Sequence, residues 1–208
     1  MLSATHVSEP HRAIICGQTG CGKTQIVLDE LLHPERGSYH NTFDIVFILC
    51  PTWKRNRIYL DRPWLWRGPR ASRFYFIEPG ERLHDWLRLR FSLYADTPTL
   101  YIVDDMSASR ASQKKKDMLS ELAFSGRHAK QSVWVLVQKY NTDCKDLREQ
   151  TKWVALFHCK DRLSFTDAHD ENDVVPHELC NSLRTSLTEA KHTKLVLKTD
   201  QPSAYAIC

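Results

Sequence analysis

The chain has 208 residues, of which 42% are hydrophobic, 26% charged and 10% aromatic. This composition is typical of a folded protein with an ordinary core, and it excludes disordered, collagen-like and disulfide-scaffold chains. The net charge of +4, from 29 basic and 25 acidic residues, permits nucleic-acid binding but is too small to argue for it alone.

Short apolar runs that end at glycine, proline or acidic residues predict strands, and segments with helical spacing follow two of them. Alternating strands and helices predict an α/β fold with a mostly parallel sheet flanked by helices. Runs that are apolar on both faces are also typical of parallel strands. We expect strands at 12–16, 43–50, 99–103, 132–137 and 152–157, and helices at 22–32 and 116–124.

The last residues predict a β-hairpin, with strands at 193–198 and 203–207 around a turn that contains Pro202. No repeat, low-complexity stretch or linker divides the chain. We therefore expect one domain over 1–208, with the hairpin as an extension at about 193–208.

A phosphate-binding loop is indicated between the first strand and the first helix. The residues match the pattern G-x-x-x-x-G-K-[ST], whose glycines allow backbone N–H groups to turn toward phosphates. The lysine then reaches the β and γ phosphates of ATP, and the last hydroxyl ligates Mg²⁺. The pattern covers Gly17, Gln18, Thr19, Gly20, Cys21, Gly22, Lys23 and Thr24.

Two carboxylates, Asp104 and Asp105, end the third predicted strand. In that position Asp104 is suited to hold Mg²⁺ together with Thr24, and Asp105 to orient or deprotonate the attacking water. Gln138 ends the fourth strand, where a neutral amide can bond the γ phosphate and that water together. The P-loop NTPase fold is thus expected to bind ATP and Mg²⁺.

Five blocks together resemble the viral genome-packaging ATPases of the FtsK–HerA superfamily. The similarity is to the poxvirus-type branch, which is also found in giant viruses, virophages, Maverick/Polinton and adintovirus-like elements. The blocks are the phosphate loop, Cys50-Pro51-Thr52, Val103-Asp104-Asp105-Met106, the stretch from Gly126-Arg127-His128 to Gln138, and Asp146-Leu147-Arg148.

The resemblance implies an ATPase that forms a homo-oligomeric ring, a pentamer or hexamer, and translocates double-stranded DNA into a capsid. It implies capsid proteins as partners, a virion and host-cell location with cytoplasm or nucleus left open, and Gln138 as the sensor glutamine. Many members carry Asp-Glu where this chain has Asp104-Asp105. Arg127 and Arg148 match family arginines and are the two candidates for a cation delivered to the neighbouring subunit's γ phosphate.

Two basic stretches are candidates for DNA contact through phosphates. The first, 53–77, interleaves basic and aromatic residues, which equally suits packing in a core or between subunits. The second follows the carboxylates and contains Arg110, Lys114, Lys115 and Lys116.

Seven cysteines without a C-x-x-C pair predict reduced thiols, and the absence of an apolar run of about 18 residues predicts a chain without a membrane span or secretory signal. Two other functions stay open beside the motor. One is a nucleoside or nucleotide kinase, and the other is a nucleotide-gated virion assembly factor.

Overall fold

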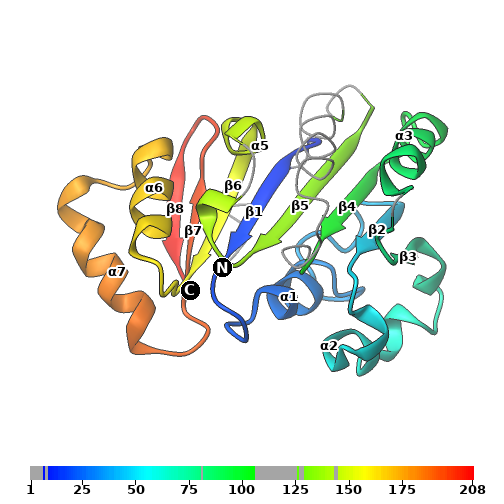
Figure 1. The fold of residues 1–208 in the computed structure, drawn as a ribbon, viewed down its shortest axis with the longest axis horizontal. Helices are drawn as coiled ribbons and strands as arrows, with labels where there is room; N and C mark the ends of the chain where they lie inside the picture. Colours follow the sequence, from blue (N-terminus) through cyan, green and yellow to red (C-terminus); the bar gives the residue numbers. More distant parts are fainter. Residues whose placement is uncertain (1–6, 8, 81, 106–125, 127–128, 143–144) are drawn as a thin grey trace.

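The computed structural model describes residues 7, 9–80, 82–105, 126, 129–142 and 145–208. Its strands join one eight-stranded sheet in the order β3-β2-β4-β5-β1-β6-β7-β8 (Figure 1). Neighbouring strands from β1 to β6 pair in parallel, whereas β6 with β7 and β7 with β8 pair antiparallel. The predicted mostly parallel sheet with a C-terminal hairpin is therefore confirmed.

The strands lie close to their predicted positions, and two of them, β1 and β4, have the predicted bounds. β2 begins two residues later and ends one residue earlier than the expected 43–50. β3 was not predicted as a strand. The bounds are β1 Arg12–Cys16, β2 Ile45–Leu49, β3 Phe74–Ile77, β4 Thr99–Val103, β5 Gln131–Val137, β6 Thr151–Phe157, β7 Lys194–Lys198 and β8 Ala204–Ile207.

The helix expected over 22–32 is present in two parts. Its first turn is α-helical, and the rest is a π-helix, in which the Leu32 N–H bonds the Val27 carbonyl at 3.0 Å. The helix expected at 116–124 lies outside the described residues. The helices are α1 Lys23–Gln25, η2 Ile26–Leu31, α2 Arg57–Leu60, α3 Leu83–Leu93, α5 Lys145–Glu149, α6 Arg162–Asn172 and α7 Cys180–Glu189, with 3-10 turns η3 Trp53–Arg55, η4 Pro63–Leu65, η5 Ala71–Arg73, η7 Tyr140–Thr142 and η8 His177–Leu179.

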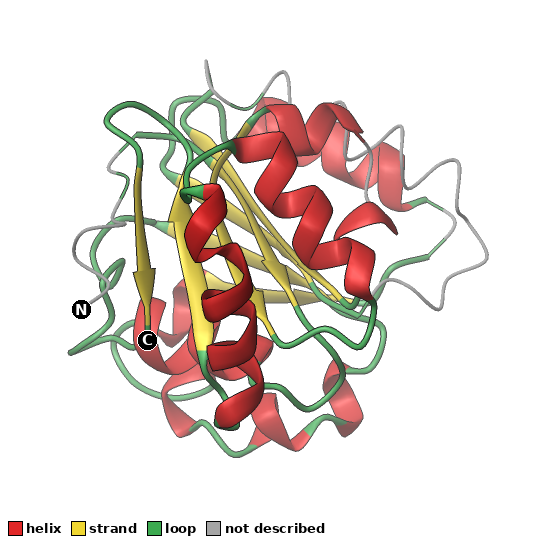
Figure 2. Cartoon of the chain, turned by 90° about the vertical axis from the view of Figure 1, so that its left-hand side faces the viewer, coloured by secondary structure: helices red, strands yellow, loops and turns green. Residues whose placement is uncertain are grey.

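Helices cover both faces of the sheet (Figure 2), so the core has two parts. Along β1, Ile14 and Cys16 pack with residues of α3, α5, α6 and α7. Ala13 and Ile15 point the other way and pack with residues of η2 and α2. This alternation explains why β1 is apolar at successive positions: both of its faces are covered.

The parallel strands bring three predicted site residues together at the carboxyl ends of the central strands. Within the sheet β5 lies between β1 and β4, with Cys16 opposite Val137 and Val103 opposite Val135. The residues that directly follow these strands therefore emerge side by side at their carboxyl ends. They are Gly17, Asp104 and Gln138.

No helix among the described residues combines the length and the apolar character needed to cross a bilayer.

Candidate nucleotide-binding site

The loop between β1 and α1 depends on glycine at specific positions. Gly20 and Gly22 have φ angles of 78° and 106°, in the left-handed region that other residues rarely adopt. A Cβ on Gly17 would lie 2.6 Å from both Cys21 Sγ and Phe157 Cβ. The loop can therefore take this path only with these glycines, as the predicted phosphate loop requires.

Lys23 spans the inside of this loop. Its Nζ donates hydrogen bonds to the carbonyl oxygens of Gly17 at 2.6 Å and Gln18 at 3.0 Å. The ammonium thus donates to two neutral carbonyl oxygens in place of water molecules. Phosphate oxygens are stronger acceptors for a cation, so this side chain is placed to transfer its bonds to a bound phosphate.

Thr24 and Asp104 meet across the sheet edge, as the predicted Mg²⁺ site requires. The Thr24 hydroxyl donates to Asp104 Oδ2 at 3.0 Å. Only 5% of Asp104 is exposed, and this burial raises the pKa of its carboxyl, although hydrogen bonds from Tyr59 and Thr24 oppose the shift. A buried carboxylate held mainly by neutral donors is suited to a divalent cation, so these residues fit Mg²⁺.

Tyr59 is a site residue that the sequence analysis did not identify. It lies in α2 and is 1% exposed, and its hydroxyl donates to the same Asp104 Oδ2 at 2.5 Å. Burial raises the pKa of Tyr59, which keeps the hydroxyl protonated and able to donate. In the sequence Tyr59 is one of several aromatic residues in a basic stretch, and no local pattern marks its role.

Asp105 differs from its neighbour because it is exposed. Its φ of 54° is unusual for a residue with a side chain, and Thr52 Oγ1 lies 3.5 Å from its Oδ2. The turn thus directs one carboxylate of the pair into the core and leaves the other open to water. This division suits the two roles predicted for Asp104 and Asp105.

Gln138 is the first residue after β5 and is exposed. The preceding residue, Val137, accepts a hydrogen bond from the Gly17 N–H at 3.0 Å, which fixes the end of β5 beside the loop. Gln138 therefore lies at the carboxyl end of β5, between the loop and Asp104, and its role as a sensor stays a prediction.

A pocket of about 450 Å³ opens on the outer side of the loop. One wall is the loop from Gln18 to Cys21, and the other includes the turn that leads into β7. From this turn the His192 Nδ1 donates to the Cys21 carbonyl at 2.8 Å, and it lies 2.7 Å from where a Cβ on Gly22 would be. His192 is a second contact that no sequence motif indicated.

Two thiols lie directly behind the loop. The Sγ atoms of Cys16 and Cys159 are 3.6 Å apart, and this hydrogen bond lowers the pKa of Cys159. All the described cysteines are free thiols.

Arg148 lies away from this chain's own loop. It belongs to α5, which precedes β6 and therefore lies at the amino ends of the parallel strands, near the top of Figure 1, whereas α1 lies near the bottom. Its Nε donates to Glu171 at 2.9 Å, and its guanidinium lies 5.5 Å from the centre of the Tyr140 ring. The other candidate, Arg127, lies outside the described residues.

The basic stretch 53–77 is largely occupied by contacts within the chain. Arg62 forms a two-point ion pair with Asp29, at 2.7 and 2.6 Å, and Arg70 and Arg73 donate to backbone carbonyls. The rings of Trp53, Trp66 and Phe76 pack against one another, and Trp66 is 38% exposed. The packing alternative thus accounts for most of these residues.

The second basic stretch, with Arg110, Lys114, Lys115 and Lys116, lies outside the described residues.

Solved structures resemble this chain over nearly its whole length. The genome packaging NTPase B204 from Sulfolobus turreted icosahedral virus 2 in complex with sulfate matches with a TM-score of 0.64 and 11% identity, covering 95% of each chain. The same protein in complex with ATP-gammaS gives 0.62 and 11% identity, covering 95% of this chain and 96% of that chain. EssC (ATPases 2 and 3) from Geobacillus thermodenitrificans gives a TM-score of 0.62 and 11% identity, covering 96% of this chain and 39% of that chain.

No protein-family model matches the chain, and no curated protein matches it in sequence. At these low identities the structural likeness shows the fold, which is that of P-loop NTPases such as the packaging NTPase.

Proposed function

We propose that this chain, which has the fold of a viral genome packaging NTPase, is an FtsK–HerA-type motor that hydrolyses ATP to move double-stranded DNA into a capsid. The observation that carries the proposal is the 3.0 Å contact between Thr24 and Asp104. It joins the loop hydroxyl to the strand-end carboxylate, the pair that a nucleotide-bound Mg²⁺ needs. The match to a packaging NTPase over 95% of both chains supports the choice of motor.

The loop from Gly17 to Thr24 would hold the phosphates of ATP, and the pocket beside His192 would hold the nucleoside. Thr24 and Asp104 would hold Mg²⁺, which when bound neutralises charge on the phosphates. Lys23 would exchange its two loop carbonyls for phosphate oxygens. This exchange supplies a positive charge where negative charge develops during transfer.

The exposed side chains complete the chemistry. Asp105 would accept a proton from, or orient, the attacking water, since it is open to solvent next to the metal carboxylate. Gln138 would bond that water and the γ phosphate. Hydrolysis would also require a cation at the γ phosphate from a neighbouring subunit. In a homo-oligomeric ring, Arg127 and Arg148 are the candidates to supply it.

The test is ATP turnover by the full chain with and without duplex DNA, at several salt concentrations. A motor is expected to turn over faster with DNA, and the stimulation should decrease as salt rises because phosphate contacts are screened. Lys23→Ala is the control for contaminating ATPases.

Two outcomes would replace the proposal. Phosphoryl transfer from ATP to a nucleoside or nucleotide, without DNA stimulation, would identify a kinase. Nucleotide-dependent binding to capsid protein without DNA stimulation would identify an assembly factor.

A further inference from the structure

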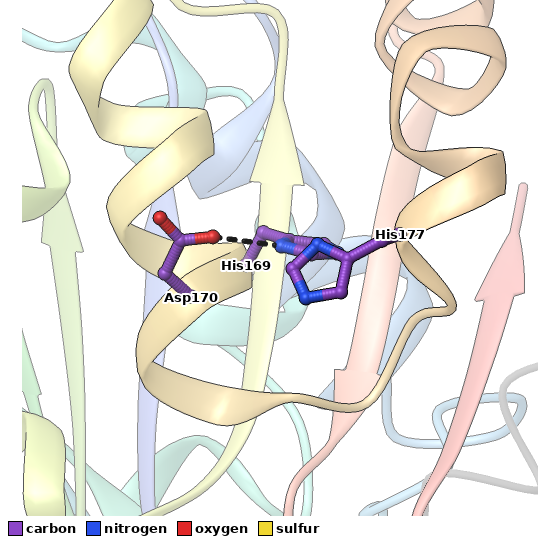
Figure 3. A group of neighbouring side chains, drawn as sticks. All are labelled: His169, Asp170 and His177. Carbon is purple, nitrogen blue, oxygen red and sulfur yellow. Dashed lines mark hydrogen bonds and ion pairs between the residues drawn. The ribbon is translucent and has the colours of Figure 1, made fainter.

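Three side chains of metal-binding type meet where α6 leads into α7, away from the phosphate loop. His169 and Asp170 lie near the end of α6, and His177 begins η8 (Figure 3). One possible ligand atom of each lies within 4.8 Å of the others. Across the residues that the structure describes, no other group of three or more histidine, cysteine or acidic side chains is this close.

The hydrogen bonds of His169 determine where its protons are. The ring is buried, with 5% exposed, and its Nε2 lies 3.0 Å from the Val175 carbonyl oxygen. A carbonyl oxygen only accepts, so Nε2 carries a proton. Nδ1 lies 3.0 Å from Asp170 Oδ1, so a neutral His169 would present a lone pair to a carboxylate. Either a proton or a metal ion bound by both atoms can satisfy this pair of acceptors.

His177 distinguishes these two possibilities. Its ring centre lies 4.7 Å from that of His169, with the planes at 63°, so a second imidazole edge is available at the same place. A proton shared by His169 and Asp170 needs no third ligand, whereas a metal ion requires further ligands. The Val175 carbonyl also matches the usual outer partner of a metal-bound histidine, which fixes the ring through its other N–H.

We propose that His169 Nδ1, Asp170 and His177 bind a divalent ion of the zinc type, with water completing its coordination. Two imidazoles and one carboxylate suit Zn²⁺, whereas Mg²⁺ prefers an all-oxygen site. The ion would join the end of α6 to the segment that starts α7. α7 leads to the turn that carries His192. By fixing the start of α7, the ion would therefore also help to fix this turn, which forms one wall of the pocket beside the phosphate loop.

The experiment is a titration of the full chain with ZnCl₂ by calorimetry, in nucleotide-free buffer that contains Mg²⁺. One ion per chain is expected, and His177→Ala and Asp170→Asn should each weaken binding at least tenfold. Both side chains are exposed, so these variants should fold, whereas a variant of buried His169 need not. The matched control is His84→Ala on α3, since His84 also adjoins an aspartate, Asp85, at 3.9 Å, and its loss should leave binding unchanged.

Thiols are a competing zinc site, so Co²⁺ is used as a second probe. Only weak visible bands are expected, without the intense near-ultraviolet bands of a Co²⁺–thiolate bond. Thiolate bands, absence of binding, or equal affinity in His177→Ala would overturn the proposal. So would an NMR spectrum in which His169 keeps both ring protons with excess Zn²⁺. None of these outcomes bears on ATP hydrolysis, which is measured separately.

Discussion

The Tyr59 hydroxyl lies 2.5 Å from Asp104 Oδ2 although 45 residues separate them in the chain. The same oxygen accepts the Thr24 hydroxyl at 3.0 Å. One carboxylate oxygen thus joins the phosphate loop, the end of β4 and the helix α2. If this carboxylate moved toward a metal ion, its hydrogen bond with Tyr59 would transmit the movement to α2, whose Arg57 and Ile58 are exposed.

Tyr59→Phe should weaken Mg²⁺ binding without preventing ATP binding. The change removes one donor to a buried carboxylate, which should lower the free energy of unfolding by about 1–3 kcal/mol. Because the carboxylate is then less well oriented, the Mg²⁺ concentration for half-maximal turnover should rise about tenfold. Tyr75→Phe, at an exposed tyrosine on β3, is the control. Equal Mg²⁺ curves for wild type and Tyr59→Phe would show that Tyr59 only fills space.

Lys23→Ala should abolish ATP turnover while the fold remains. Gly17 keeps its hydrogen bond to Val137, and Gln18 keeps its bond to His158, so the loop retains two backbone anchors. The γ phosphate loses its cation, and turnover should fall by a factor on the order of a hundred or more. Circular dichroism checks the fold and phosphate release checks the rate. A normal rate would contradict the assignment of the loop.

Asp104→Asn should stabilise the protein near neutral pH and inactivate it. Burial raises the pKa of Asp104, so the carboxyl favours folding when protonated, and that contribution is lost as pH rises through its folded-state pKa. Asparagine can still accept bonds from Tyr59 and Thr24 but carries no charge. The melting temperature should therefore exceed that of wild type at pH 7, and the difference should shrink toward pH 4. A difference in melting temperature that stays constant from pH 7 to pH 4 would show that desolvation of the Asp104 charge does not cause the stabilisation.

Arg148→Ala should destabilise the chain by about 1 kcal/mol, because it removes the ion pair with Glu171 and the contact with Tyr140. If Arg148 is also the arginine that acts on a neighbouring subunit, mixing Arg148→Ala with Lys23→Ala subunits should restore part of the turnover. Mixed rings regain interfaces between an intact loop and an intact arginine.

The same mixture with Arg127→Ala tests the other candidate. Recovery with only one of the two arginine variants identifies the residue that acts between subunits. Turnover that depends on neither protein concentration nor DNA would contradict a ring motor.

The parts of the fold that were predictable are those that local sequence determines. β1 and β4 are apolar runs bounded by residues that break strands, and Asp104 is marked by its place at the end of one of them. The phosphate loop is marked because its backbone needs glycine at fixed positions. β3 was missed because it is a short, partly exposed strand at the sheet edge, within a stretch that is also rich in arginine.

Contacts of residues that belong to no motif could not be predicted in this way. Tyr59 reaches Asp104, and His192 reaches Cys21, only because the sheet order brings their segments together. Neither residue type nor spacing signals such contacts in a single sequence. The ion pair of Arg148 with Glu171 was hidden for the same reason.

The bond between His192 and the Cys21 carbonyl connects residues 171 positions apart. During synthesis on the ribosome, Cys21 emerges long before His192. A nascent chain that has already made β1 and α1 therefore still lacks the outer wall of its phosphate loop. Firm nucleotide binding should therefore require the segment that carries His192 as well as the loop itself.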